Sequence, residues 1–179
     1  MNRVFGVCLL GILGFMLASA AVLSVKLEKK TILGDRVEAL IPADFEVMSE
    51  ELMRVKYPSE RRPTLVYTDK SAGVNVAFNH TSSRATQAQL EAYKNNFVAT
   101  FKNMYPSAEW LGSGVKEING RKVGYLELVT PAADQKVYNL MFFTDLDGRL
   151  LLATFNCIDR KRKDWHEPAQ QIMHSLNIK

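Results

Sequence analysis

The stretch VKEINGRKVGYLELVTPAADQKVYNLMFFTDLDGRLLLATFNC, residues 115–157, decides the fold of this chain. Asn119-Gly120 lies between two apolar runs, which is the strongest short signal for a β-hairpin, because a type I′ turn needs positive φ at both central residues. Asp145 to Gly148 forms a second turn pattern further along. The stretch therefore predicts successive antiparallel strands over 115–118, 121–130, 137–144 and 149–157.

The last two of these strands are apolar on both alternations. Tyr138, Leu140 and Phe142 fall on one face of the third strand, and Met141 and Phe143 fall on the other. A strand that is apolar on both faces must be covered on both faces. The pattern therefore predicts a sheet packed between two other layers.

Two amphipathic helices follow from apolar spacing. Helix 87–105 is predicted from a stripe that starts after a Thr86/Gln89 capping pattern and ends at Pro106; its members are Leu90, Tyr93, Phe97, Phe101 and Met104, with Val98 alongside. A closing helix is predicted from about Asp164, with the apolar face Ala169, Ile172, Met173 and Leu176.

Shorter strands are predicted before the first helix, at 37–41, 64–68 and 73–80, the last with one wetter side. Strands in a row followed by helices indicate an α+β protein rather than a doubly wound one. We expect an α-β-α sandwich with a central, largely antiparallel sheet of about six or seven strands and flanking helices.

The N-terminal segment is predicted to direct export. Residues 1–25 hold a single charge, Arg3, before an uncharged run from Val4 to Val25, and Ala18-Ser19-Ala20 supplies the small residues of a cleavage site. The prediction is a signal peptide over 1–20, a linker over 21–36 and one domain over 37–179. The alternative is an uncleaved membrane anchor extending to about residue 25, because 22 uncharged residues can span a bilayer. We expect a periplasmic or envelope-associated protein, anchored to the membrane in the alternative.

The sequence shows no pattern of catalytic or metal-binding residues. The histidines His80, His166 and His174 lack ligand spacing, and no Cys-x-x-Cys, His-Glu-x-x-His or phosphate-binding glycine loop occurs. Cys157 lies in a strand that is apolar on both faces, which is typical of a buried, unreactive thiol. We expect no enzyme activity, no cofactor and no metal. A net charge of +4 is too mild for a nucleic-acid-binding protein.

One basic cluster, Arg160-Lys161-Arg162-Lys163 with Trp165, is the candidate contact for a partner or for anionic lipid head groups. The alternative is a solvated connection between the last strand and the closing helix.

From Leu27 onward the chain resembles the DcrB-like bacterial envelope proteins, which share a fold with the photosystem II protein PsbP. The resemblance lies in four segments: Leu40-Ile41-Pro42-Ala43-Asp44, residues 115–122, residues 150–154, and Ile172 followed by Leu176-Asn177-Ile178. These are packing and turn positions, and no site residue carries over. The resemblance implies a non-enzymatic domain that works in envelope maintenance or as a protein adaptor. Some relatives are lipoproteins, but this chain lacks a usable lipidation site.

Three functions remain open from the sequence. The first is a non-catalytic envelope protein that binds a protein partner or serves assembly and maintenance. The second is a small-ligand-binding protein or enzyme with a pocket between the 87–105 helix and the sheet, beside His80 or Tyr93. The third is a membrane-surface protein held by its N-terminal segment and by the basic cluster at 160–163.

Overall fold

The computed structural model describes residues 25–59 and 62–179. Its strands and helices, in chain order, are β1 (Leu27–Ile32), β2 (Val37–Pro42), β3 (Glu46–Val47), α1 (Glu50–Lys56), β4 (Leu65–Thr68), β5 (Val74–Arg84), the 3-10 turn η1 (Gln87–Gln89), α2 (Leu90–Met104), β6 (Glu109–Ile118), β7 (Arg121–Pro131), β8 (Lys136–Leu146), β9 (Arg149–Ile158), the 3-10 turn η2 (Asp159–Lys161), α3 (Arg162–His174) and β10 (Asn177–Ile178). The signal peptide or anchor predicted at the N-terminus lies outside the described residues. Within the described ranges, no helix is both long and apolar enough to cross a membrane.

The main sheet has seven antiparallel strands in the order β3-β4-β5-β9-β8-β7-β6. A second, three-stranded sheet has the order β1-β2-β10. The predicted α+β class and the central antiparallel sheet are confirmed. The Asn119-Gly120 turn has φ of 50° and 75°, as a type I′ hairpin requires, and Asp147-Gly148 does the same with 51° and 72°.

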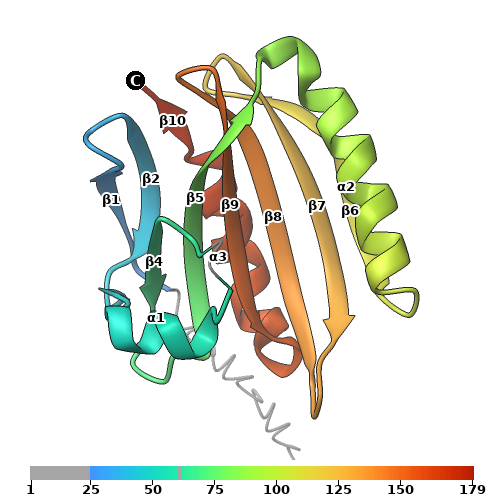
Figure 1. Cartoon of the computed structure of the whole chain (residues 1–179). Coiled ribbons are helices and arrows are strands. Elements are labelled where there is room, and N and C mark those ends of the chain that lie inside the picture. The colour runs from blue at the N-terminus through green and yellow to red at the C-terminus, as the bar shows by residue number, and fades with distance from the viewer. Residues whose placement is uncertain (1–24, 60–61) are drawn as a thin grey trace, which may run out of the picture.

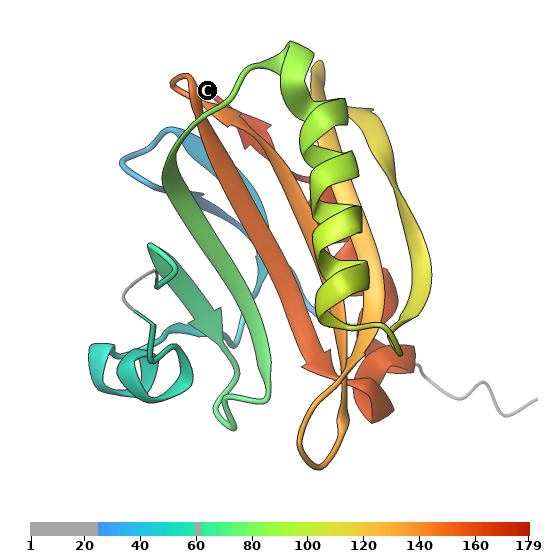
Figure 2. The same cartoon turned by 45° about the vertical axis from the view of Figure 1, so that its right-hand side comes forward.

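Helices cover both faces of the main sheet (Figures 1 and 2). This was predicted from the apolar residues on both alternations of the strands within residues 115–157. On one face, α3 and the β1-β2-β10 sheet bury a large apolar core, in which Tyr138, Leu140 and Phe142 are fully buried. On the other face, α2 packs Leu90 and its aromatic stripe against a second core that includes Leu126, Leu128 and Phe143. The protein is therefore an α-β-α sandwich.

The linker prediction was wrong for part of its range. Residues 27–32 form β1, which pairs with β2 along its whole length, from Leu27 opposite Pro42 to Ile32 opposite Val37. The turn between them holds Leu33, Gly34 and Asp35 at positive φ. The charges of this strand face solvent, and only Ile32 is buried in it, which is why its composition resembled a linker.

Two helices start at other residues than predicted, and one residue of the predicted apolar stripe is exposed. Thr86 makes no capping bond to the backbone, and its hydroxyl instead hydrogen-bonds the Gln89 side chain at 3.2 Å, so the first turn is 3-10 and α2 starts at Leu90. Met104 ends the stripe but is 59% exposed, because α2 extends beyond the core there. The closing helix starts at Arg162, two residues before Asp164.

Strand β5 is longer than predicted and lacks the wetter side expected over 73–80. Ala77 packs in a small core with Met48 and Val66, which α1 covers with Leu52 and Met53. Asn75 is 5% exposed and donates a hydrogen bond to the Asn156 side chain at 3.0 Å. The alternation with polar residues therefore reflected satisfied buried amides, not solvent.

The Asp145 carboxylate on β8 connects η1, just before α2, to β7. Asp145 accepts hydrogen bonds from Gln87 Nε2 at 2.5 Å and from Arg121 at 2.7 Å. Burial acts to raise the pKa of Asp145, but these two side chains outweigh it and the pKa is lowered. The aspartate therefore favours the folded state while it is ionised.

The space between α2 and the sheet, where a ligand pocket was an alternative, is filled by apolar side chains. Phe97 meets Phe143 edge-on with ring centroids 5.0 Å apart. The Tyr93 hydroxyl lies at the rim and donates to the backbone carbonyl of Arg84 at 2.6 Å. His80 lies on the opposite face of the sheet and contacts the Leu146 carbonyl through Nε2 at 3.0 Å. Polar groups therefore do not converge between α2 and the sheet.

Candidate functional site

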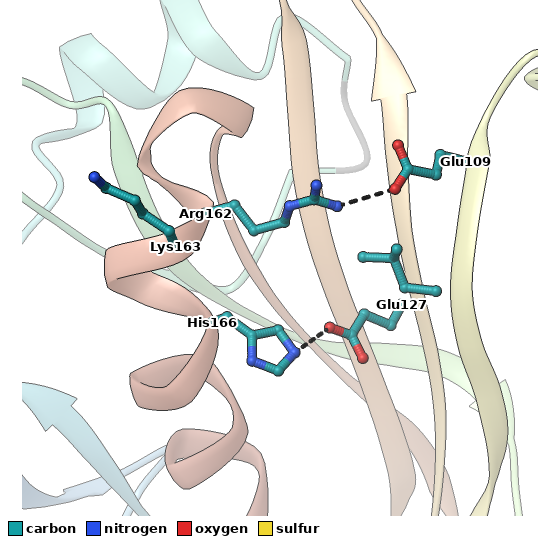
Figure 3. Close-up of a pocket in the computed structure, with 6 residues that line it drawn as sticks. Glu109, Glu127, Arg162, Lys163 and His166 are labelled. Carbon is teal, nitrogen blue, oxygen red and sulfur yellow. Dashed lines mark hydrogen bonds and ion pairs between the residues drawn. The ribbon is translucent and has the colours of Figure 1, made fainter.

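A hollow lies between α3 and the edge strand β6. It has a volume of about 550 Å³ and is lined by Glu109, Leu111, Glu127, Arg162, Lys163 and His166. Figure 3 shows Arg162 and His166 extending from α3 toward the strands, with Lys163 directed away from them.

The hollow exists because α3 covers only part of this face of the main sheet. The helix packs on β2, β8 and β9, and it contacts β6 through the Arg162 side chain, which lies 3.3 Å from Glu109. On this face, β6 presents Gly112 opposite Glu127 and Gly114 opposite Tyr125. A β-bulge between Trp110 and Gly112 accommodates Leu111, which is 40% exposed and lines the hollow. Because Gly112 has no side chain, β6 leaves space opposite Glu127, between Leu111 and the Tyr125 ring.

Glu127 is the buried charged residue of this site. Its side chain is only 9% exposed. Its Oε1 accepts a hydrogen bond from the Tyr138 hydroxyl at 2.7 Å and lies 3.0 Å from His166 Nε2. Its Oε2 accepts a hydrogen bond from Gln170 at 3.1 Å. The carboxylate is therefore fixed in position by one strand residue and two residues of α3.

The arginine of the hollow is already engaged elsewhere. Arg162 contacts Glu109 at 3.3 Å, across the hollow, and Asp159 at 3.1 Å, next to its own helix. Among the residues that the structure describes, no lysine or arginine forms an ion pair with Glu127. The donors that hold this carboxylate are thus a phenol, an amide and an imidazole.

The nucleophilic groups near Glu127 are held in their protonated forms. Burial, and then the hydrogen bond and charge of Glu127, raise the pKa of Tyr138 well above its ordinary value. Burial also raises the pKa of the Cys157 thiol to about 12, and Cys157 is directly opposite Tyr138 in the β8–β9 pair. Neither group is ionised at neutral pH, and an un-ionised thiol or phenol is a weak nucleophile.

The free edge of the main sheet runs beside the hollow. β6 is the last strand of the sheet, and it is ten residues long, whereas the strand at the other end, β3, has two. Tyr125 packs under the two glycines of β6, and Lys116 lies over its ring with Nζ 4.9 Å from the centroid. Such an edge offers unpaired backbone groups to an added strand.

The basic cluster predicted as a contact surface is dispersed in the structure. Lys161 lies 3.6 Å from Asp69, and Arg162 faces Glu109 and Asp159. Trp165 packs into the large core, with its ring 5.5 Å from Phe45 and 5.7 Å from Phe155. Arg160 and Lys163 remain exposed. These residues stand on η2 and the first turn of α3, and not in a free connection.

Sequence reasoning did not identify Glu127. The signal was available, because Glu127 is a charged residue between Leu126 and Leu128 in a strand that is otherwise apolar on both faces. His166 had no comparable signal, because its approach to Glu127 depends on how α3 lies on the sheet.

The comparisons with known proteins concern the fold. A scan against protein families finds no match to the sequence, and a search of curated proteins also finds none. The solved structures that resemble this chain include the cyanobacterial PsbP protein CyanoP from Synechocystis sp. PCC 6803, with a TM-score of 0.63 and 16% identity over 93% of this chain and 100% of that one. They also include PA94 from Pseudomonas aeruginosa, a protein of unknown function, with a TM-score of 0.50 and 10% identity over 86% of this chain and 97% of that one. LpqN from Mycobacterium tuberculosis, described as involved in cell envelope biogenesis, has a TM-score of 0.47 and 12% identity over 79% of this chain and 82% of that one.

The likeness to CyanoP confirms the expected PsbP-like fold. At 16% identity it establishes the fold alone.

Proposed function

We propose that this chain is a non-catalytic, exported protein of the bacterial cell envelope, of the DcrB-like kind, that binds a protein partner and serves assembly or maintenance. The observation that carries the proposal is the hollow beside β6, where a fixed carboxylate lies one strand in from an open sheet edge and the neighbouring Tyr138 and Cys157 stay protonated. The apolar N-terminal run and its small-residue cleavage pattern support export.

The geometry supports binding for a physical reason. Acid–base or nucleophilic catalysis needs a group whose pKa lies near the working pH, or one that is activated by a base. Here burial moves the pKa of the thiol away from that range. A rigid polar group beside unpaired backbone groups is instead a typical element of peptide recognition.

The test is site-specific photo-crosslinking in living bacteria that produce the full chain. A photoreactive amino acid at Ser113 or Glu117, both exposed on β6, is expected to give a discrete adduct with an envelope protein. The matched control is position Lys29, exposed on β1 at the edge of the smaller sheet, which is expected to give no such adduct. The proposal fails if neither β6 position yields an envelope protein, or if β1 yields the same one.

A second candidate, contact with an anionic membrane surface, rests on Arg160 and Lys163. Both are exposed, and neither makes an ion pair within the described residues. Sedimentation with vesicles that contain phosphatidylglycerol is expected to weaken for an Arg160→Gln/Lys163→Gln variant, with Lys29→Gln as the control. Equal sedimentation of both variants and the parent chain would exclude this contact.

A further inference from the structure

Glu127 differs from the other poorly exposed carboxylates of the described residues in its partners. Asp145, 15% exposed, is held by Arg121 at 2.7 Å, and Asp69, 18% exposed, lies 3.6 Å from Lys161. Glu38, 21% exposed, lies 2.9 Å from Lys179. Glu127 is the least exposed of the four, at 9%, and its ion-pair partner is a histidine.

A buried carboxylate without a fixed cation is unusual, because removing a charge from water is costly unless the charge is paired. The hydrogen bonds from Tyr138, Gln170 and His166 offset part of this cost. A carboxylate can accept about four hydrogen bonds, so one position remains open to a further donor. Among the described residues no lysine or arginine pairs with this carboxylate, and the side from which one can arrive is the hollow.

The path from the sheet edge to Glu127 crosses Gly112. Gly112 is directly opposite Glu127 in the β6–β7 pair. A strand added at β6 would place a residue about 10 Å from the Glu127 backbone, which is two strand spacings. The long stem of a lysine or arginine can reach across Gly112 toward Glu127. The Tyr125 ring borders this way, 3.6 Å from where a β-carbon of Gly112 would lie.

The edge itself is suited to an added strand only beyond the bulge. From Gly112 to Ile118 the β6–β7 register is regular, and seven residues are enough for a short strand pairing. Within the described residues, no other strand pairs with β6 along its outer edge. Leu111, on the bulge, adds an apolar contact at the end of this segment.

We propose that residues 112–118 of β6 accept an extended segment of a partner protein, and that a lysine or arginine of this segment crosses Gly112 to form an ion pair with Glu127. This inference rests on the proposed function and specifies the partner's chemistry. Three cations lie near this path. Arg162 is neutralised by Glu109 and Asp159, Lys163 is directed away (Figure 3), and Lys116 lies over the Tyr125 ring with Nζ 4.9 Å from its centroid.

The experiment is a selection of random nonapeptides displayed on phage against the purified full chain. We expect the enriched peptides to hold a lysine or arginine at one fixed position between β-branched residues. Each enriched peptide is then synthesised with that residue and with norleucine, a neutral side chain of similar length. The norleucine form is expected to bind about tenfold more weakly to the parent chain, the effect of losing one charge-assisted hydrogen bond.

Two variants isolate the contact. On Glu127→Gln, which keeps an acceptor for Tyr138, the two peptide forms are expected to bind equally. Gly112→Val fills the path, so both forms are expected to lose binding. Its β-carbon would lie 3.6 Å from the Tyr125 ring, an ordinary contact, and circular dichroism and the Tm verify that the variant is folded. Glu117→Gln, which removes an exposed carboxylate of the same strand that does not line the hollow, is the matched control, and it is expected to keep the tenfold preference.

The proposal is overturned if no peptide is enriched, if the enriched peptides show no preference for a basic residue, or if Gly112→Val binds them as the parent chain does. It is also overturned if sedimentation shows that β6 pairs with a second copy of this chain and that Gly112→Val abolishes this pairing. The proposed function fails separately, when crosslinking from β6 in cells captures no envelope protein. An envelope protein that is captured through a segment without lysine or arginine would support that function and reject this inference.

Discussion

Gly124 on β7 gives the sharpest test of the packing between the sheet and α2. A β-carbon added at this position would lie 2.3 Å from Cε2 and Cζ of Phe143, far inside the 3.5–4.0 Å of a favourable contact. Phe143 cannot move aside easily, because it is fully buried and meets Phe97 of α2 edge-on at 5.0 Å. Gly124→Ala must therefore displace either the ring or the helix.

The expected loss follows from this geometry. Adding a methylene to a well-packed core costs about 1–3 kcal/mol, and a clash with an immobile ring belongs at the upper end, near 3 kcal/mol. For a protein of this size, that corresponds to a fall in Tm of about 6–12 °C. Urea unfolding followed by circular dichroism measures the free energy, and a thermal scan measures Tm.

Two further substitutions serve as controls: alanine at a second glycine that has more space, and a smaller side chain at Phe143 that removes the clash. Gly112→Ala, whose β-carbon would lie at 3.6 Å from Tyr125, is expected to change the free energy of unfolding by less than about 0.5 kcal/mol. Phe143→Leu removes the two clashing ring atoms, so the double variant Gly124→Ala/Phe143→Leu is expected to be about 2 kcal/mol more stable than the sum of the single effects predicts. Additive single effects, or a loss below about 0.5 kcal/mol for Gly124→Ala, would refute the reasoning.

Three further outcomes are expected. Tyr138→Phe removes a donor to the buried Glu127 and should lower the free energy of unfolding by about 1–3 kcal/mol in urea titrations; an unchanged midpoint would contradict the hydrogen bond. Cys157 is buried, with its pKa raised to about 12, so in a Cys8→Ser chain Ellman's reagent at pH 8 should react only as fast as the protein unfolds, and rapid labelling would show an accessible thiol. The lowered pKa of Asp145 contributes stability above about pH 4, and this stability is lost as the pH falls through the folded pKa. Asp145→Asn should therefore lose less stability than the parent chain between about pH 5 and pH 2. Parallel acid-unfolding curves would exclude this role.

The strands of residues 115–157 could be predicted because two signals agreed. Asn119-Gly120 supplied the turn, and apolar residues on both alternations required cover on both faces. The signals were weaker where they conflicted. β6 starts at Glu109 and not at Val115, but its first half holds Gly112 and Gly114, which are poor strand formers and take part only because Tyr125 packs beneath them.

The site was less predictable than the fold, since it depends on contacts between distant segments. Arg160 to Lys163 read as one basic surface along the sequence, but the 3-10 turn and the start of α3 direct Lys161 and Arg162 to different acids. Lys161 lies near Asp69, which is far away in the sequence. A linear run of cations therefore gives no indication of which charges stay available.

Glu127 and Asp145 allow a last comparison that separates a binding charge from a structural one. Asp145→Asn at pH 8 leaves Arg121, which is only 34% exposed, without its carboxylate, so an uncompensated cation remains and the free energy of unfolding should fall by about 1–3 kcal/mol. Glu127→Gln leaves no lysine or arginine unpaired and keeps an acceptor for Tyr138, so its effect should stay within about 1 kcal/mol. Urea unfolding of both variants at pH 8 makes the comparison. If Glu127→Gln is the more damaging change, the carboxylate holds α3 to the sheet, and its position beside the hollow is incidental. If it is the milder one, the fold does not need the charge of this buried glutamate, as the proposed ion pair with a ligand cation requires.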